Sequence, residues 1–277
     1  SIILSNNAFI FSDSAWNVNG SDGLINISGT EKNLGGGILI SDSKNKSFFK
    51  NVNFAYLKGL NKNLDDINLQ YSLLGSINFY ESEILMENCN FKKITSEDAL
   101  NIINSNFILD NIVFLENYSD GIDIDFGQGS ISNSNFLDIG NDAIDVSGAD
   151  VKISNVIINN AGDKMVSVGE NSNVSILNLK GENSHVGIAS KDGSLTKLNN
   201  VNLKNTSIGV SAYQKKTEYP KAKIVASNLT IVDSTMNWLT DYNSEIFIED
   251  QLINSKTDQI IPIIYNKNIK LINKIKN

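Results

Sequence analysis

A repeat of 22 residues constrains the fold of this 277-residue chain more than any other feature of its sequence. Six similar segments begin at Asp98, Asp120, Asp142, Lys164, Val186 and Ile208, each 22 residues after the last. Each has an apolar residue at its third position, and most have another two residues later, which is the pattern of a β-strand with one face turned inward. The constant step predicts strands stacked in successive coils of a solenoid.

The inward positions form two apolar columns when the segments are aligned. The first column contains Leu100, Ile122, Ile144, Val166, Ile188 and Val210, and the second contains Ile102, Ile124, Val146 and Val168. Ile77 and Phe79 extend the columns 23 residues upstream, and residues 36–40 look like an earlier coil. The longer interval between Ile38 and Ile77 predicts a protruding loop.

Apolar stretches with an asparagine at the same position of the repeat indicate a second strand in each coil. These asparagines are Asn88, Asn111, Asn133, Asn155, Asn178, Asn200 and Asn228. Asparagine tolerates left-handed backbone, and its amide can bond the amide of the next coil. We therefore expect a structural asparagine ladder at the inner turn of each coil.

These patterns predict an all-β chain, a right-handed parallel β-helix with about 22 residues per coil and about nine coils. We interpret residues 1–277 as one domain. Residues 1–33, irregular in sequence, are expected to cap one end, residues 34–250 to form the coils, and residues 251–277 to form a second cap or a junction.

Composition excludes several classes of function. The net charge of −8 and the absence of a basic cluster beyond short lysine pairs argue against a nucleic-acid partner. No apolar stretch is long enough to insert in a membrane. The single cysteine, Cys89, excludes an intrachain disulfide and is expected to be buried.

The coil length, asparagine ladder and strand pattern of residues 36–250 resemble the pectate-lyase-like parallel β-helix superfamily. The stretches from Gly140, Gly162, Gly187 and Ala212 also resemble bacterial β-helix repeat proteins of unassigned activity, some of which accompany modules similar to spore-coat protein kinases. The resemblance implies a secreted or cell-surface protein, part of a larger chain, whose partner is an acidic polysaccharide. It also implies a substrate cleft on the outer face of the first sheet.

That face carries a concentration of carboxylates on two adjacent coils. The residues are Asp120, Asp123, Asp125, Asp142 and Asp145. Carboxylates stacked about 5 Å apart repel each other by about 3 kcal/mol at an effective dielectric near 20, so a compensating group is expected. Bound Ca²⁺, shared protons or the ammonium of Lys164 could each supply it, and a solvated ladder of aspartates is the structural alternative.

A lyase of this fold needs a group that neutralises the uronate, a base and an acid. Lys164 or Lys191 could act as base beside Asp123 and Asp145, with Tyr213 as acid. Asp123 and Asp145 could instead form the acid–base pair of a hydrolase, although the motifs of polygalacturonases are absent and the only Asp-Asp pair, Asp65-Asp66, lies in the predicted loop.

The insertion from Tyr213 to Pro220 places further polar and aromatic groups beside the acidic face, and such a loop suits sugar binding. Its Lys215, Lys216 and Glu218, together with Tyr80, are the predicted substrate-binding residues. The only histidine, His185, is expected to have a turn or packing role. The sequence therefore predicts a polysaccharide-active protein, lyase-like if it is catalytic, or a noncatalytic adhesin-like or polysaccharide-binding module of a surface protein.

Overall fold

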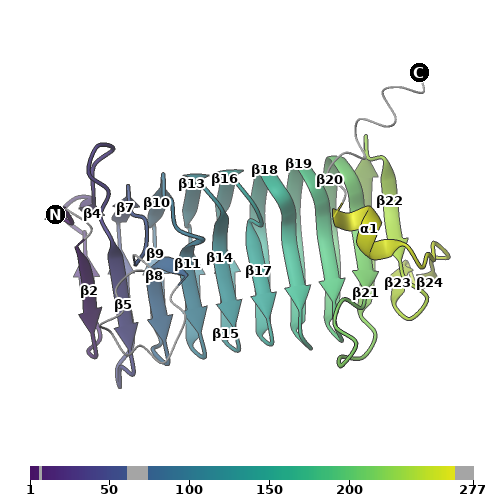
Figure 1. Cartoon of the computed structure of the whole chain (residues 1–277), viewed down its shortest axis with the longest axis horizontal. Helices are drawn as coiled ribbons and strands as arrows, with labels where there is room; N and C mark the ends of the chain where they lie inside the picture. The colour runs from purple at the N-terminus through teal and green to yellow at the C-terminus, as the bar shows by residue number, and fades with distance from the viewer. Residues whose placement is uncertain (6–7, 61–73, 266–277) are drawn as a thin grey trace.

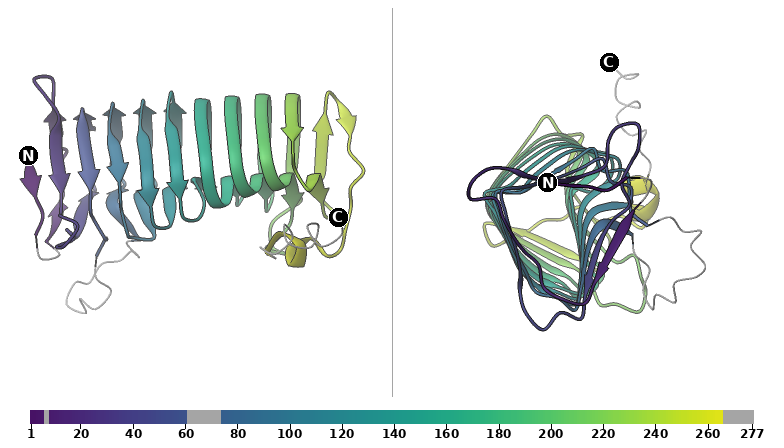
Figure 2. Two further views of the ribbon diagram at one scale, coloured as in Figure 1. Left: turned by 90° about the horizontal axis from the view of Figure 1, so that it is seen from above. Right: turned by 90° about the vertical axis from the view of Figure 1, so that its left-hand side faces the viewer.

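The chain forms a parallel β-solenoid of about 10 turns with roughly 23 residues per turn (Figure 1). The computed structural model describes residues 1–5, 8–60 and 74–265. Its strands pair in parallel with strands one turn away and close a tube with three faces, as the view along the axis shows (Figure 2). The predicted all-β repeat fold is confirmed, and its right hand stays a prediction.

Face 1 contains the strands in which the 22-residue repeat is most regular. It comprises β2 (Phe9–Ser12), β5 (Gly37–Ser41), β8 (Gly75–Tyr80), β11 (Asp98–Ile103), β14 (Asp120–Asp125), β17 (Ile144–Ser147), the last parts of β18 (Asp150–Gly169), β19 (Asn173–Lys191) and β20 (Leu195–Tyr213), and β22 (Met236–Thr240).

Faces 2 and 3 complete each turn. Face 2 comprises β3 (Asn17–Asn19), β6 (Ser47–Lys50), β9 (Ile84–Glu87), β12 (Asn106–Asp110), β15 (Gln128–Ser132), the first parts of β18, β19, β20 and β21 (Lys223–Val232), and β23 (Glu245–Ile248). Face 3 comprises β1 (Ile2–Ile3), β4 (Ile25–Ser28), β7 (Val52–Ala55), β10 (Asn90–Lys92), β13 (Val113–Asn117), β16 (Asn135–Ile139) and the following parts of β18 to β21.

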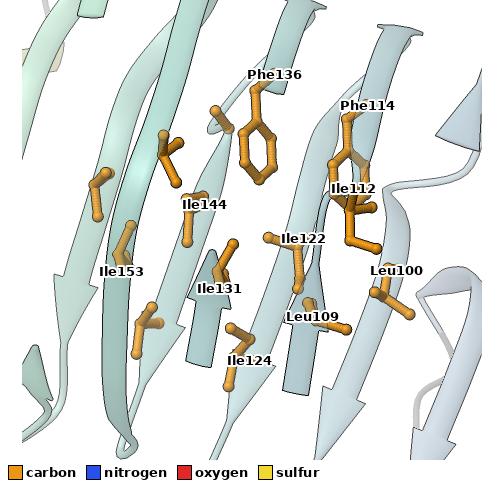
Figure 3. Close-up of a cluster of buried hydrophobic side chains, with 14 of the residues drawn as sticks. Leu100, Leu109, Ile112, Phe114, Ile122, Ile124, Ile131, Phe136, Ile144 and Ile153 are labelled. Atoms are coloured by element: carbon orange, nitrogen blue, oxygen red, sulfur yellow. The ribbon is translucent and has the colours of Figure 1, made fainter. Parts of the chain in front are cut away.

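The core fills the tube with columns of like residues. Leu100 pairs with Ile122, and Ile122 with Ile144, as the sequence predicts, and all three are fully buried (Figure 3). On face 3 the rings of Phe91, Phe114 and Phe136 stack with centroids 4.7 Å apart at each step. Burial of the inward columns continues from coil to coil, and ring stacking links the coils that carry these phenylalanines, so the packing of one coil fits that of the next.

The asparagine ladder lies at an exposed corner between faces 2 and 3, so its predicted position at an inner turn is wrong. Its members have left-handed backbone, as expected, with φ values such as 54° at Asn155 and 57° at Asn178. The Asn155 Nδ2 donates to Asn133 Oδ1 at 3.1 Å, and the Asn178 Nδ2 donates to Asn155 Oδ1 at 2.9 Å. A second ladder, at the corner between faces 3 and 1, includes Asn160, which donates to Asp138 at 2.7 Å.

The predicted end caps stay predictions, although the strands near both ends can be described. Strands β1 to β4 pair in parallel with β4 to β7, so these four strands continue the solenoid toward the N-terminus. At the other end β24 (Gln251–Leu252) pairs antiparallel with β23, and helix α1 (Ile260–Tyr265) lies along the side of the tube. Residues 266–277 of the predicted cap lie outside the described residues, as do residues 61–73 of the predicted loop.

Two further predictions can be compared with the fold. Cys89 is fully buried, as expected, and burial raises the pKa of its thiol to about 11. Within the part of the chain that the structure describes, no helix has the length and hydropathy of a membrane span.

Asn155→Ala is expected to lower the free energy of unfolding by about 2 kcal/mol, because it removes two amide hydrogen bonds and places a Cβ-bearing residue without a compensating amide in left-handed backbone. Asn155→Gly loses the same bonds but tolerates the backbone, so it should cost less. Thermal and urea unfolding followed by circular dichroism measures both. An alanine variant as stable as the wild type would contradict a structural ladder.

Candidate functional site

The outer side of face 1 brings the predicted carboxylates together. Asp123 pairs in register with Asp145, and Asn101 precedes both in the same outward column. Asp125 lies two residues beyond Asp123 at the end of β14, opposite Ser147 of the next coil. Because neighbouring parallel strands are about 4.8 Å apart, the three aspartates form one patch on two adjacent coils.

A second set of carboxylates lies where these strands begin. Asp98 pairs with Asp120, and Asp142 lies two residues before the next strand, β17. The Asp142 backbone N–H donates to Asp120 Oδ1 at 2.9 Å, and the Lys164 backbone N–H donates to Asp142 Oδ1 at 2.8 Å. Asp120 and Asp142 therefore bind the backbone of the following coil, a structural task that the sequence did not indicate. We refer to Asp98, Asp120, Asp123, Asp125, Asp142 and Asp145 together as the aspartate strip.

Asp98 is the member of the strip that the site prediction omitted. It is 2% exposed, and it occupies the repeat position 22 residues before Asp120, so the repeat itself could have found it. The Asn101 Nδ2 donates to Asp98 Oδ2 at 3.2 Å and to Asp123 Oδ2 at 3.4 Å. This amide links the carboxyl groups of two coils.

Five aspartates of the strip have pKa values above the ordinary range. Burial is the largest cause, and neighbouring carboxylates add to it. Burial raises the pKa of Asp98 to about 8 and that of Asp142 to about 7. The pKa values of Asp120 and Asp125 rise to about 6 for the same reason. The pKa of Asp123, between Asp98 and the other acids of the strip, lies well above its usual range.

Lys164 lies at the C-terminal end of the aspartate strip, where carboxylates hold its ammonium group. It is 4% exposed, and its Nζ forms ion pairs with Asp142 at 3.5 Å and with Asp163. Burial alone would lower the pKa of Lys164, but the carboxylates of Asp142 and Asp163 outweigh it and hold that pKa above the ordinary value. A protonated, paired ammonium is unsuited to abstracting a proton.

The other predicted catalytic residues, Lys191 and Tyr213, pair with each other at the ends of β19 and β20. Lys191 is half-buried, whereas Tyr213 is fully buried in an apolar cluster. Burial raises the pKa of Tyr213 well above its usual range. A buried tyrosine at this place has no direct path to a substrate on the outer face.

The loop after Tyr213 folds back onto the solenoid. Asp192 Oδ1 accepts the backbone N–H groups of Lys215 and Lys216 at 2.6 and 2.7 Å. The Lys216 ammonium pairs with Glu170. Of the predicted substrate-binding residues in this loop, Lys215 and Glu218 are exposed and Lys216 is half-buried.

The remaining predicted substrate-binding residue, Tyr80, is separated from this loop along the axis. It ends β8, one coil before Ile103 and two coils before Asp125 in the same outward column. It therefore lies on the N-terminal side of the aspartate strip, while Lys215, Lys216 and Glu218 lie on its C-terminal side. The structure does not bring the predicted substrate-binding residues into one cluster.

Helix α1 covers the part of face 1 that follows the strip. Its Ile260 and Ile264 pack against Val186, Ala189 and Ile208, on coils where the outer side is apolar. The ring of His185 bonds the Ile264 carbonyl at 2.5 Å, in agreement with the predicted packing role. The helix thus covers coils beyond the aspartate strip, where Lys191 remains half-buried.

Among the residues that the structure describes, no group of three or more His, Cys, Asp or Glu side chains has the geometry of a metal site. Ca²⁺ binding by Asp120, Asp123, Asp125, Asp142 and Asp145 therefore stays a prediction. Two of the five, Asp120 and Asp142, already bind backbone N–H groups.

No known family model matches this chain, and no curated protein is similar to it in sequence. Among solved structures, the crystal structure of the Agl-KA catalytic domain is similar with a TM-score of 0.48 and 12% identity, over 87% of this chain and 62% of that one. A variant of the catalytic domain of a GH87 alpha-1,3-glucanase in complex with nigerose gives 0.40 and 11%, over 86% and 63%. The Siphovirus 9NA tailspike receptor binding domain gives 0.30 and 9%, over 92% and 74%.

The chain spans less than two thirds of the first two structures. Similarities of this size are too low to carry an argument about activity. The parallel β-helix part of the resemblance predicted from sequence is present in the fold, while the narrower resemblance to pectate lyases stays a prediction.

The aspartate strip is expected to make stability fall as pH rises. An unfolded aspartate has a pKa near 3.9, whereas Asp98 has a pKa of about 8 in the fold, so the folded chain binds more protons between these values. The melting temperature should therefore be higher at pH 5.5 than at pH 8. Asp98→Asn should raise it mainly at pH 8 and flatten the dependence, whereas the exposed control Asp22→Asn should not. An unchanged slope in Asp98→Asn would contradict proton uptake at this site.

The same melting measurement at pH 8 tests the calcium prediction. Ca²⁺ added to EDTA-treated protein should raise the melting temperature, because a cation bound only by the folded strip offsets its repulsion. Asp123→Asn combined with Asp145→Asn should abolish this rise. A melting temperature that does not respond to Ca²⁺ in the wild type would count against a calcium site.

Proposed function

We propose that the outer side of face 1 binds a polysaccharide and hydrolyses a glycosidic bond with Asp123 and Asp145. The observation that carries this proposal is the register pairing of these two carboxyl groups on adjacent coils, which precede the coils against which α1 packs. Paired carboxyl groups are the usual machinery of glycoside hydrolysis.

The two residues have environments that suit different roles. Burial and neighbouring acids keep a proton on Asp123, whose pKa lies well above its usual range, as a general acid requires. Asp145 Oδ1 accepts the Val146 backbone N–H at 3.0 Å and its side chain is partly exposed, which suits a carboxylate that acts as nucleophile. The backbones of the two coils are about 4.8 Å apart, a spacing that would allow the separation of about 5 Å between carboxyl groups that is typical of enzymes that retain the anomeric configuration.

Hydrolysis fits the site better than β-elimination. A lyase needs a base, and Lys164 is buried, ion-paired and protonated. The carboxylates also disfavour an anionic substrate without a bridging cation. We therefore propose an uncharged glycan in place of the acidic polysaccharide expected from sequence, with Lys191 as the remaining candidate base if elimination occurs.

A noncatalytic glycan-binding or adhesin-like module is the second candidate. It is favoured by the internal bonds of Asp120 and Asp142, which show that part of the strip serves the fold. Either function is consistent with a secreted or cell-surface protein and with a place in a larger chain, and both belong to this proposal.

Asp123→Asn and Asp145→Asn are each expected to lower the rate of glycan hydrolysis about 10²-fold or more, because each removes one partner of the acid–base pair. The wild type is first screened against neutral and uronate polysaccharides by reducing-end release and by ultraviolet absorbance. Asp22→Asn, on an exposed turn far from face 1, should keep the wild-type rate.

The products distinguish the alternatives. New reducing ends without absorbance indicate hydrolysis, whereas absorbance from an unsaturated product would show a lyase and overturn the proposed chemistry. Binding of a glycan without either product would favour the noncatalytic module.

A further inference from the structure

A groove of about 720 Å³ runs beside the aspartate strip, along the corner between faces 1 and 2. Its lining comes from five successive coils, from the turn after β5 to the turn after β17. The groove is therefore elongated along the solenoid axis, and its volume falls in the range of ligand sites. It begins immediately after Asp125, the last residue of β14.

Phe126 interrupts the pattern of this corner. The preceding corner positions are Asp42, Glu81 and Asn104, all polar and all with φ near 50°, and the next one is Gly148. Phe126 adopts the same left-handed backbone, with φ of 55°, although a large aromatic residue is disfavoured there. Its side chain is also 60% exposed, so burial in the core does not account for it. A residue that opposes both backbone preference and burial points to function.

Gly148 supports the ring from the next coil. A Cβ built on Gly148 would lie 2.6 Å from Cδ1 and 2.7 Å from Cε1 of Phe126, closer than atoms can approach. Glycine at this position therefore lets the ring lie against the backbone of the neighbouring corner. Phe126 keeps a large exposed surface and is one of the residues that line the groove.

Polar side chains line the groove around this ring. Asn104 Nδ2 donates to Glu81 Oε1 at 3.2 Å, and Asn106 Nδ2 donates to Glu83 Oε1 at 3.2 Å. Gln128 is exposed on the same coil as Phe126. Exposed amide and carboxylate groups of this kind donate and accept bonds with hydroxyl groups.

The charge of the groove is nearly balanced. Glu81, Glu83 and Asp150 contribute three carboxylates, against the ammonium groups of Lys44 and Lys46. Such a lining gives no preference for a strongly charged ligand. One exposed aromatic ring surrounded by hydrogen-bonding groups suits a pyranose, which has an apolar face and polar edges.

We propose that this corner groove is a sugar-binding subsite in which a neutral pyranose ring stacks on Phe126. Its hydroxyl groups bond the amides of Asn104, Asn106 and Gln128. They also bond the neighbouring carboxylates of Glu81 and Glu83. The subsite holds the glycan chain beside Asp125 and so aligns it along the aspartate strip. The choice of a glycan as ligand rests on the proposed function, whereas the site itself rests on Phe126 and the groove.

Phe126→Asn is the decisive variant, because it removes the ring and restores the residue type of the corner. Affinity electrophoresis of the intact chain through gels containing dextran, soluble starch, laminarin or galactomannan measures binding. The variant should bind the retarding glycan at least tenfold more weakly, while its melting temperature stays equal to or above that of the wild type. Phe126→Tyr, which keeps the ring, and Tyr242→Ala, which removes an exposed aromatic ring outside the groove, should bind like the wild type.

Wild-type affinity in Phe126→Asn would overturn the subsite, as would the absence of retardation by every glycan in the panel. The two proposals fail separately. If Phe126→Asn binds normally while Asp123→Asn and Asp145→Asn abolish hydrolysis, the subsite is wrong and the proposed function stands. If Phe126→Asn loses binding and the wild type cleaves none of the glycans, the subsite stands and the hydrolase is wrong.

Discussion

In-register stacking of parallel coils is the interaction on which the rest of this structure depends. Each strand bonds the strand one turn away, so a residue at one repeat position contacts residues of the same position above and below it. The backbone groups of a narrow tube are satisfied by this stacking, and the core becomes a set of columns. In several columns, side chains of the same type therefore stack on one another. The chemistry of the residue type decides whether that contact stabilises the fold.

Phenylalanine and asparagine gain from such contacts. The rings of Phe114 and Phe136 stack, and the amides of Asn155 and Asn178 donate and accept in turn. Stacked aspartates destabilise the fold, because identical charges are placed one coil apart. The structure limits this cost by retaining protons on the strip and by ending it with the buried ammonium of Lys164, which pairs with Asp142.

The regular features of the fold could be predicted because a fixed repeat carries every column forward. The inward columns at Leu100 and Ile102 and the outward pairing of Asp123 with Asp145 follow from spacing alone. The three faces are harder to predict, because at most two residues separate the strands of faces 2 and 3 from β6 to β16, and β18 to β21 continue through this corner without a break. The asparagine at that corner was placed at an inner turn because both locations use left-handed backbone.

Features that depend on contacts between distant segments cannot be predicted from the repeat. The segment that forms α1 is apolar, rich in β-branched residues and contains a proline, so its pattern gives little sign of a helix or of the face that it covers. The backbone bonds of Asp120 and the ion pairs of Lys164 depend on how adjacent coils meet at the strand entrances. Phe126 did leave a signal, since it is the aromatic residue in a column of polar residues and glycine.

The solenoid does not require acids on the outer side of face 1. The column that contains Asp123 and Asp145 has Asn101 on the preceding coil and Ser167 and Ala189 on the following ones. Those coils have the same strand pairing and the same buried core without stacked carboxylates in this column. Because Asp123 and Asp145 add repulsion and burial cost and, unlike Asp120 and Asp142, accept no backbone N–H from the described residues of the following coil, a ligand for this face is the explanation that we propose. The strained Phe126 directly beyond the strip supports the same conclusion, because relief of its backbone would require only the asparagine that another coil already has at that corner.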